Sequence, residues 1–378
     1  MRICFLSNYF NHHQKPISDA LFEKTSGNYY FVATGEISEW RKQLGYKEMN
    51  APYVLEYGKD NENGEIDRII LDSDVVILGA ADISLVKKRL IAGKLTYLCT
   101  ERIYWKNIPW YRLLSHYCKF YWWYRRFDNF YLLCASAYTS SDFLRTGTFK
   151  DKAYKWGYFP ERIKYHESEL IIRKEKNNTE SGYVSILWVG RLIDWKHPEA
   201  CLFLAERLKS KGCHFKISVI GTGSMEAELK AKASEMCLSA YIDFMGAMPP
   251  EEVRSHMENN SIFISTSDEQ EGWGAVLNEA MNSACAVVAS NAMGAAPYLI
   301  SNGSNGYLFN SLDWDTMASK VDLLIKDVER RKSVSINAYR TIARAWNAET
   351  AATRLICLSS GLLENIKMDY VTGPCSKA

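Results

Sequence analysis

The chain has 378 residues, a length that suggests two domains. Hydrophobic residues make up 47% and charged residues 24%, which excludes disorder as a whole-chain state. Lys and Arg total 46 against 44 Asp and Glu, so the net charge of +2 argues against nucleic acid or another polyanion as partner. Residues 1–160 hold 22 of the basic and 17 of the acidic residues, which suggests that only the first half meets an anionic surface.

The ten cysteines are scattered without CxxC spacing, so neither a zinc site nor a redox pair is predicted. This usage fits a reducing compartment. The apolar run at the start is too short for a signal peptide, and no stretch reaches the length of a membrane span. We therefore expect a cytoplasmic protein, either free or peripheral on the cytoplasmic face of the inner membrane.

Short apolar runs that predict buried parallel strands alternate with helical patterns along the chain. The strands predicted in the first half are residues 2–6, 29–33, 75–78, 95–99, 132–137 and 153–158. Those in the second half are 184–189, 216–220, 241–244, 262–265 and 286–289. Predicted helices between and after them include 198–209, 225–235, 250–259, 275–283 and 313–338. This alternation predicts two Rossmann-like, doubly wound α/β domains.

The domain boundary follows from composition. Residues 161–182 are polar and charged, which predicts a linker between a first domain at 1–160 and a second at 183–367. We expect that the last helix can pack back on the first domain and that the polar tail, 368–378, frays. Two such domains would face a cleft at the carboxyl ends of both sheets, where ligands usually bind.

The most informative segment is 265–281, which reads STSDEQEGWGAVLNEAM. A strand ends near Ser265 and a helix begins near Gly274, so the first backbone N–H groups of that helix would suit a phosphate. Glu271 lies just before the helix, and Glu279 lies one turn inside it with its side chain tilted back. Carboxylates accept hydrogen bonds from sugar hydroxyls, so the arrangement fits a nucleotide sugar. Either glutamate taken alone also fits a solvated surface acid.

Two cations follow another predicted strand. Arg191 comes directly after Gly190 at the end of that strand, and Lys196 precedes a helix with Pro198 in its first turn. An Arg fork and a Lys point charge at the carboxyl end of a sheet can neutralise a diphosphate. The GTGS turn at 221–224 follows the next strand and is a weak signal alone, because most such turns only connect a strand to a helix.

Together these motifs resemble the retaining glycosyltransferases of the large family 4 type, which have the two-domain GT-B fold and include enzymes of bacterial capsule and surface polysaccharides. The resemblance is carried by Gly190-Arg191 with Lys196, by Gly221-Thr222-Gly223, by Phe244-Met245-Gly246, and by Glu271 and Glu279 within EGWGAVLNEAM. The motifs cover most of residues 184–310. The resemblance implies an acceptor-binding first domain and a second domain that binds the nucleotide-sugar donor.

The resemblance also implies a role for each matching residue. Arg191 and Lys196 would hold the donor diphosphate and stabilise it as it leaves. Glu271 would bind hydroxyls of the donor sugar, and Glu279 those of the ribose. The remaining donor-binding positions would be Gly190, Gly221, Gly223, Met245, Gly246, Gly272, Trp273, Gly274 and Ala275. The anomeric configuration would be retained, and with two cations on the diphosphate we expect no metal and no cofactor.

The first half offers fewer candidates for chemistry. His12 and His13 follow the first predicted strand, and Glu101 follows the fourth. Each of these side chains could orient or deprotonate an acceptor hydroxyl. The alternative is structural: the histidines would close their loop, and Glu101 would pair with a neighbouring cation.

Residues 102–127 hold eleven aromatics, six Lys or Arg, and no Asp or Glu. Trp and Tyr favour the membrane interface, and Lys and Arg favour anionic lipid headgroups, so the segment predicts a membrane contact near a lipid-linked acceptor. The residues expected in that contact are Trp105, Trp110, Arg112, Lys119, Trp122, Trp123, Arg125 and Arg126. The alternative is that about half of the aromatics line the core or the cleft.

The sequence therefore predicts a glycosyltransferase that moves a sugar from a nucleotide-diphosphate donor to a glycan or lipid-linked glycan, in surface polysaccharide biosynthesis. Two alternatives stay open. A sugar-nucleotide epimerase of the same fold would turn over its substrate without an acceptor. A non-catalytic scaffold would bind sugar nucleotides or polysaccharides without transfer, and would not need cations for a leaving diphosphate.

Overall fold

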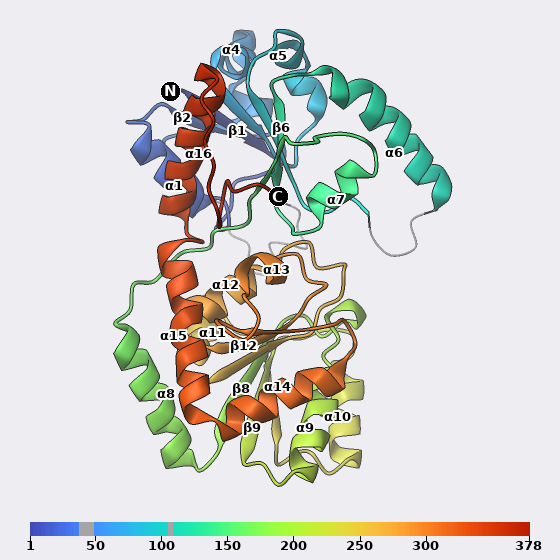
Figure 1. Cartoon of the computed structure of the whole chain (residues 1–378), viewed down its shortest axis with the longest axis vertical. Coiled ribbons are helices and arrows are strands. Elements are labelled where there is room, and N and C mark those ends of the chain that lie inside the picture. Colours follow the sequence, from blue (N-terminus) through green and yellow to red (C-terminus); the bar gives the residue numbers. More distant parts are fainter. Residues whose placement is uncertain (38–48, 105–108) are drawn as a thin grey trace. The chain divides into compact units, whose positions relative to one another are not determined.

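The computed structural model describes residues 1–37, 49–104 and 109–378 (Figure 1). They divide into two compact units, Met1–Glu161 with Ala345–Ala378, and Arg162–Arg344. Each unit has a parallel sheet with helices on both faces. The prediction of two doubly wound α/β domains is confirmed.

The sheet of the first unit has seven strands in the order β3-β2-β1-β4-β5-β6-β7. These are β1 (Ile3–Ser7), β2 (Tyr29–Ala33), β3 (Val54–Glu56), β4 (Val75–Leu78), β5 (Thr96–Thr100), β6 (Phe130–Cys134) and β7 (Ala153–Lys155). The described helices are α1 (Lys15–Lys24), α3 (Tyr57–Asp60), α4 (Glu65–Asp72), α5 (Lys87–Ile91), α6 (Trp110–Trp123), α7 (Thr139–Leu144) and α16 (Ala348–Glu364), with short 3₁₀ turns η1 (Glu62–Gly64), η2 (Ile83–Val86) and η3 (Tyr124–Arg126).

The final helix α16 belongs to the first unit, where it packs against α1. Its Ser359 hydroxyl is hydrogen-bonded to the buried Tyr97 hydroxyl of β5 at 3.1 Å. The tail that follows does not fray, contrary to the expectation. Cys375 is buried, and the backbone N–H of Ala378 donates to the carbonyl of Ala153 at 3.1 Å. The edge strand β7 has free backbone groups on one side, and the tail satisfies them.

The sheet of the second unit has six strands in the order β10-β9-β8-β11-β12-β13. These are β8 (Val184–Val189), β9 (Phe215–Ile220), β10 (Ile242–Gly246), β11 (Ile262–Ser265), β12 (Ala286–Ser290) and β13 (Tyr307–Phe309). The helices are α8 (Glu167–Ser181), α9 (Ala200–Ser210), α10 (Glu226–Glu235), α11 (Pro250–Asn259), α12 (Ala275–Asn282), α13 (Ala296–Leu299), α14 (Trp314–Lys326) and α15 (Val328–Arg344), with a 3₁₀ turn η4 (Asp194–Lys196).

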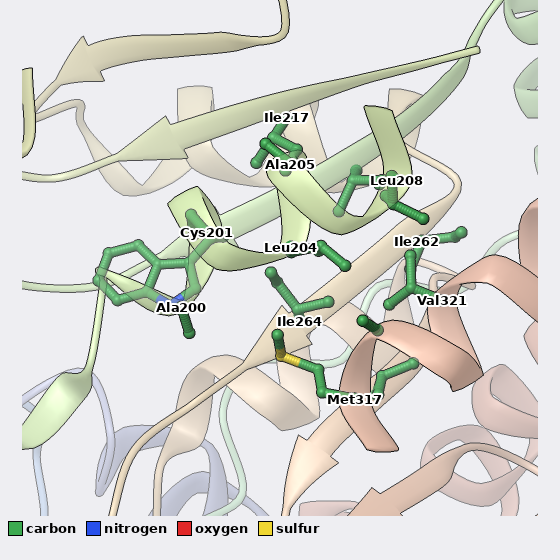
Figure 2. Packing of buried hydrophobic residues seen from close by; sticks show 14 of the residues in the cluster. Ala200, Cys201, Leu204, Ala205, Leu208, Ile217, Ile262, Ile264, Met317 and Val321 are labelled. Atoms are coloured by element: carbon green, nitrogen blue, oxygen red, sulfur yellow. The ribbon is translucent and has the colours of Figure 1, made fainter. Parts of the chain in front are cut away.

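The core of the second unit forms where α9 and α14 cover one face of the sheet (Figure 2). Leu204 and Leu208 of α9 meet Ile264 of β11 and Val321 of α14, and each of these side chains is fully buried. Burying such side chains supplies most of the stabilisation of the fold, at about 1.5–3 kcal/mol each. The strands β11 and β12 are fully buried and apolar up to a final serine, because both faces of the sheet are covered there.

Two predictions about helices are wrong in detail. Residues 167–181, expected as linker, form α8 inside the second unit, where Lys174 is buried and its Nζ atom donates to the carbonyl of Met257 at 2.6 Å. The single helix expected at 313–338 is two helices, α14 and α15. Asp327 between them is extended, and its carboxylate accepts from the N–H of Arg330 at 2.9 Å, which starts the second helix.

Candidate functional site

The predicted donor residues gather where the strand order of the second sheet reverses. From β8 the chain proceeds outward through β9 and β10, and it then returns to β11 on the other side of β8. The connections that follow two neighbouring strands at such a point run to opposite faces of the sheet. They form a crevice, and ligands of doubly wound folds bind there. Arg191 and Lys196 follow β8, and Glu271 follows β11.

The two loops at this point are tied together by hydrogen bonds. The Trp188 indole of β8 donates to the Thr266 hydroxyl at 2.9 Å, and that hydroxyl donates to the carbonyl of Lys196 at 2.6 Å. The N–H of Asp268 donates to the carbonyl of Trp195 at 3.0 Å. The loop with the cations and the loop with Glu271 therefore hold each other in place.

Lys196 and Glu271 form an ion pair across these loops. The Ser267 hydroxyl donates to the same carboxylate oxygen of Glu271 at 3.1 Å. Only 14% of the Lys196 side chain and 13% of the Glu271 side chain are exposed. Charges that are so little exposed to water are weakly screened, so they interact strongly with a bound ion.

Trp195, which was not among the predicted site residues, contacts both predicted cations. The guanidinium of Arg191 lies over the Trp195 ring, with Cζ 5.4 Å from its centre, and the Lys196 ammonium lies 4.7 Å from that centre. Both distances fit a cation–π interaction. The only signal in the sequence was its position between the two cations.

The helix after Glu271 begins at a glycine that no other residue could replace easily. Gly274 is the N-cap residue of α12, with a φ of 90°. A Cβ atom there would lie 2.2 Å from Cε of Met293. Among the described residues no side chain caps this helix end, an arrangement that suits the anion site expected there.

Glu279 lies inside α12, half-buried, with Oε1 3.9 Å from Nη2 of Arg254. Burial raises the pKa of its carboxyl, and Arg254 acts in the opposite direction. Trp273 was predicted to meet the donor through its backbone, and its side chain is buried and donates to the Asn278 side chain at 2.9 Å.

The glycines of the GTG turn have a packing role that the structure makes clear. A Cβ on Gly221 would lie 1.9 Å from the carbonyl oxygen of Gly190, and one on Gly223 would lie 2.3 Å from that of Leu192. The turn therefore fits closely against the loop with Arg191. At the end of β10, the pairing register shifts between Phe244 and Gly246, and Met245 is exposed.

His197, also absent from the predicted site residues, bridges the same two loops. Its Nδ1 atom lies 2.9 Å from a carboxylate oxygen of Glu199, and its Nε2 atom lies 3.6 Å from one of Asp268. The hydrogen bond to Glu199 is the main cause that raises the pKa of His197, and Asp268 adds to the effect.

In the first unit, the structure connects the predicted histidines with Glu101 through a fourth residue. The rings of His12 and His13 lie 4.0 Å apart, and the ring of Tyr158 stacks on His13 at 6.1 Å. The Tyr158 hydroxyl donates to Glu101 Oε1 at 2.5 Å. Burial, with a smaller contribution from His12, lowers the pKa of His13 to about 3, so that ring is neutral at physiological pH.

The predicted membrane residues fall into two sets. Trp110, Arg112, Lys119, Trp122, Arg125 and Arg126 are exposed. Trp123 instead is half-buried, since it packs on the core of the first unit and against Phe127 at 5.3 Å between ring centres. Trp105 lies outside the described residues. Among the helices that are described, none is both long and apolar enough to span a bilayer.

Comparison with known proteins gives a consistent result for the second unit. Residues 171–341 match the family described as "Glycosyl transferases group 1". A curated relative, the amylovoran biosynthesis glycosyltransferase AmsK of Erwinia amylovora, is 30% identical over 35% of this chain and 34% of its own length. The putative colanic acid biosynthesis glycosyltransferase WcaL of Salmonella typhimurium is 24% identical over 46% of this chain and 44% of its own. The chain spans less than half the length of these relatives.

Solved structures match over nearly the whole chain. HepE of Anabaena, crystallised with UDP, has a TM-score of 0.67 at 14% identity and covers 97% of this chain and 99% of its own. A glycosyltransferase from Rickettsia africae has the same TM-score at 17% identity, with 96% and 99% covered. At these identities the match shows the fold, which is the two-domain GT-B fold of glycosyltransferases.

Proposed function

We propose that this protein is a glycosyltransferase that transfers a sugar from a nucleotide-diphosphate donor to a glycan or lipid-linked glycan during surface polysaccharide biosynthesis. The observation that carries the proposal is the meeting of Arg191, Lys196 and Glu271 beside the uncapped N-terminus of α12. The matched relatives are named for polysaccharide biosynthesis, and HepE was crystallised with UDP, which supports both the pathway and the kind of donor.

The site suits departure of a nucleoside diphosphate. As the bond from the sugar to the diphosphate breaks, negative charge builds up on the leaving oxygens. Arg191, Lys196 and the N–H groups of the first turn of α12 would stabilise that charge most in the transition state. The diphosphate would take over Lys196 from Glu271, and the freed carboxylate of Glu271 would accept hydrogen bonds from the donor sugar. Glu279 would bind the ribose.

The finer features of the mechanism are part of the same proposal. We infer that the reaction retains the anomeric configuration and that the two cations make a divalent metal unnecessary. This inference is supported by the resemblance of the motifs to family 4 enzymes and by the two cations at the site. In the first unit, His12, His13, Glu101 and Tyr158 would position the acceptor hydroxyl.

The test is calorimetric titration of UDP, GDP, dTDP and CDP into the purified protein in the presence of EDTA. We expect one nucleotide to bind, and the Glu279→Ala variant to lose that binding. The matched control is Glu269→Ala, which removes a carboxylate from the same loop region without touching the ion pair. Absence of binding by all four nucleotides would overturn the proposal.

A second assay separates transfer from the other reactions that the fold supports. With the sugar nucleotide of the base that binds, we expect product only when an acceptor glycan is added. Turnover without an acceptor would show an epimerase, and binding without any turnover would show a scaffold. The anomeric configuration of the product, read by NMR coupling constants, would decide retention.

A further inference from the structure

The helix α6 in the first unit presents an unusual face to solvent. Its exposed large side chains are Trp110, Tyr111, Leu114, Tyr117 and Trp122, with 74% of Trp110 and 69% of Trp122 exposed. In Figure 1 the helix extends along the outer side of the first unit, away from its sheet. Side chains of this size are seldom exposed together on one helix of a soluble protein.

Most aromatic residues of this region belong to one of two faces, and Tyr121 is half-buried. Phe120 on α6 and Tyr124 just after it are buried in the core of the first unit, and Trp123 packs against the same core. Successive residues of a helix are about 100° apart, so the exposed aromatics and Leu114 share an arc of roughly 140° away from Phe120. The core therefore explains one set of aromatics, and the other set is left open to solvent among the described residues.

Basic side chains border the exposed arc. Arg112 and Lys119 lie between it and the buried face, and Arg125 and Arg126 follow at the carboxyl end of the helix. The Arg125 guanidinium stacks on Tyr121 at 5.0 Å and donates to its hydroxyl at 2.8 Å. Residues 109–127 contain no Asp or Glu. An acid on another element, Asp82, faces Lys119, and the pKa of Asp82 is lowered mainly by hydrogen bonds from Ser84, with a small contribution from Lys119.

We propose that the exposed face of α6 docks on an anionic lipid membrane. Trp and Tyr place an apolar ring and a polar edge at the boundary of a bilayer, and Lys and Arg beside them reach the phosphates of the headgroups. A helix with one apolar aromatic face and basic borders lies in the plane of that boundary. Charge complementarity and the choice of Trp and Tyr favour this occupant over a second protein surface.

The docking has a consequence for substrate choice. A membrane-bound first unit would bring the enzyme to a glycan carried on a lipid, which is the acceptor class that the docking favours. That consequence rests on the proposed function. The membrane contact itself does not, because it uses neither the donor site nor a nucleotide.

The test is co-flotation of the protein with vesicles of phosphatidylcholine alone or mixed with phosphatidylglycerol. We expect binding to the mixed vesicles at low salt and a loss of binding at high salt, because surface charges are screened. The variant Trp110→Ser/Trp122→Ser should bind on the order of tenfold more weakly. The variant Arg112→Gln/Lys119→Gln should weaken binding to mixed vesicles about thirtyfold, at about 1 kcal/mol for each cation.

Matched controls come from the second unit. Ile172→Ser/Tyr183→Ser removes exposed apolar side chains, and Lys176→Gln/Lys230→Gln removes exposed cations. Both should bind vesicles like the unchanged protein. Lipids brominated near the headgroup should quench tryptophan emission in the unchanged protein, and this quenching should be lost in Trp110→Ser/Trp122→Ser. Circular dichroism melting checks that every variant is folded.

Three outcomes would overturn the proposal. The first is no binding of the unchanged protein to anionic vesicles at low salt. The second is equal binding by the α6 variants and the controls. The third is a dimer in analytical ultracentrifugation that Trp110→Ser/Trp122→Ser converts to a monomer without any vesicle binding, which would assign the face to a second copy. Nucleotide titration is independent of all three, so failure of the donor site would be seen separately.

Discussion

Lys196 and Glu271 form an ion pair that joins the loop after β8 to the loop after β11 in the second unit. Both side chains are largely withdrawn from water, so neither is a simple surface charge. In the unliganded protein each neutralises the other. In the proposed function, a diphosphate would give the cation a new partner, and the carboxylate would become available to hydroxyls. The pair therefore holds the two loops together in an arrangement that would suit a donor.

Removing one partner of this pair should cost more than removing both. We expect Lys196→Ala to lower the free energy of unfolding by about 1–2 kcal/mol, because Glu271 is left charged and poorly solvated. Adding Glu271→Gln should recover much of that loss. Urea denaturation of the two single variants and the double variant measures the coupling. If the losses of unfolding free energy in the two single variants add up to the loss in the double variant, the ion pair does not contribute to stability.

Arg191 should matter for turnover more than for folding, since it is exposed and would meet the leaving diphosphate in the proposed function. We expect Arg191→Ala to lower kcat/KM by about 10²–10³, the usual effect of losing one group that stabilises transition-state charge. Arg191→Lys should recover part of the activity because it keeps the charge without the fork. Arg207→Ala is the control, because Arg207 also stacks on an aromatic ring at the surface of the second unit.

Trp195 should hold both cations in place for the donor. Replacing it with Leu removes the aromatic face, and we expect donor affinity to fall about two- to fivefold for each cation–π interaction that is removed, from about 0.5–1 kcal/mol each. Trp195→Phe should retain most of the affinity. Calorimetric titration of the nucleotide that binds gives both values. Equal decreases in the Leu and Phe variants would indicate a packing role alone.

His197 should make the link between the donor loops depend on pH. Its pKa is raised above its ordinary value of 6.5, first by the hydrogen bond to Glu199. Folding therefore favours the protonated ring. The stability that this protonation contributes is fully present at a pH below the ordinary pKa, and it is lost as the pH rises through the raised pKa of the folded protein. We expect about 1 kcal/mol of stability to be lost over that range.

His197→Gln should remove this part of the pH dependence, which thermal melting across the pH range would detect. His214→Gln, on the same unit, is the control and should leave the profile unchanged. A profile that is identical in the unchanged protein and in His197→Gln would contradict the interpretation.

Tyr158 should act in the first unit on the acceptor and not on the donor. We expect Tyr158→Phe to lower kcat by about tenfold or more, because Glu101 loses its hydroxyl partner and its orientation. The affinity for the donor nucleotide should not change. A pH–rate profile that shifts in Tyr158→Phe would support a role through Glu101, and a variant with unchanged kcat would contradict it.

Much of this protein could be predicted from local patterns. Apolar runs marked most strands because both faces of each sheet are covered, and the run EGWGAVLNEAM marked the turn into α12. The strands β3 and β13 were missed because each has three residues and no apolar run continues after it, whereas the equally short β7 is followed by the aromatic residues Trp156 and Tyr158. The helix α8 was missed because its buried face includes Lys174, a residue that composition assigns to the surface.

The two α/β domains, the cations, the glutamates and the basic aromatic segment could all be found in the sequence, because each of these depends on neighbours along the chain. Which side chains meet became clear only in the folded protein. Lys196 pairs with a carboxylate 75 positions away, and Tyr158 bonds one 57 positions away. The fold also separates the aromatics of α6 that are core from those that face solvent. Such contacts depend on the order of strands in a sheet, and pairing between distant strands leaves no local pattern in the sequence.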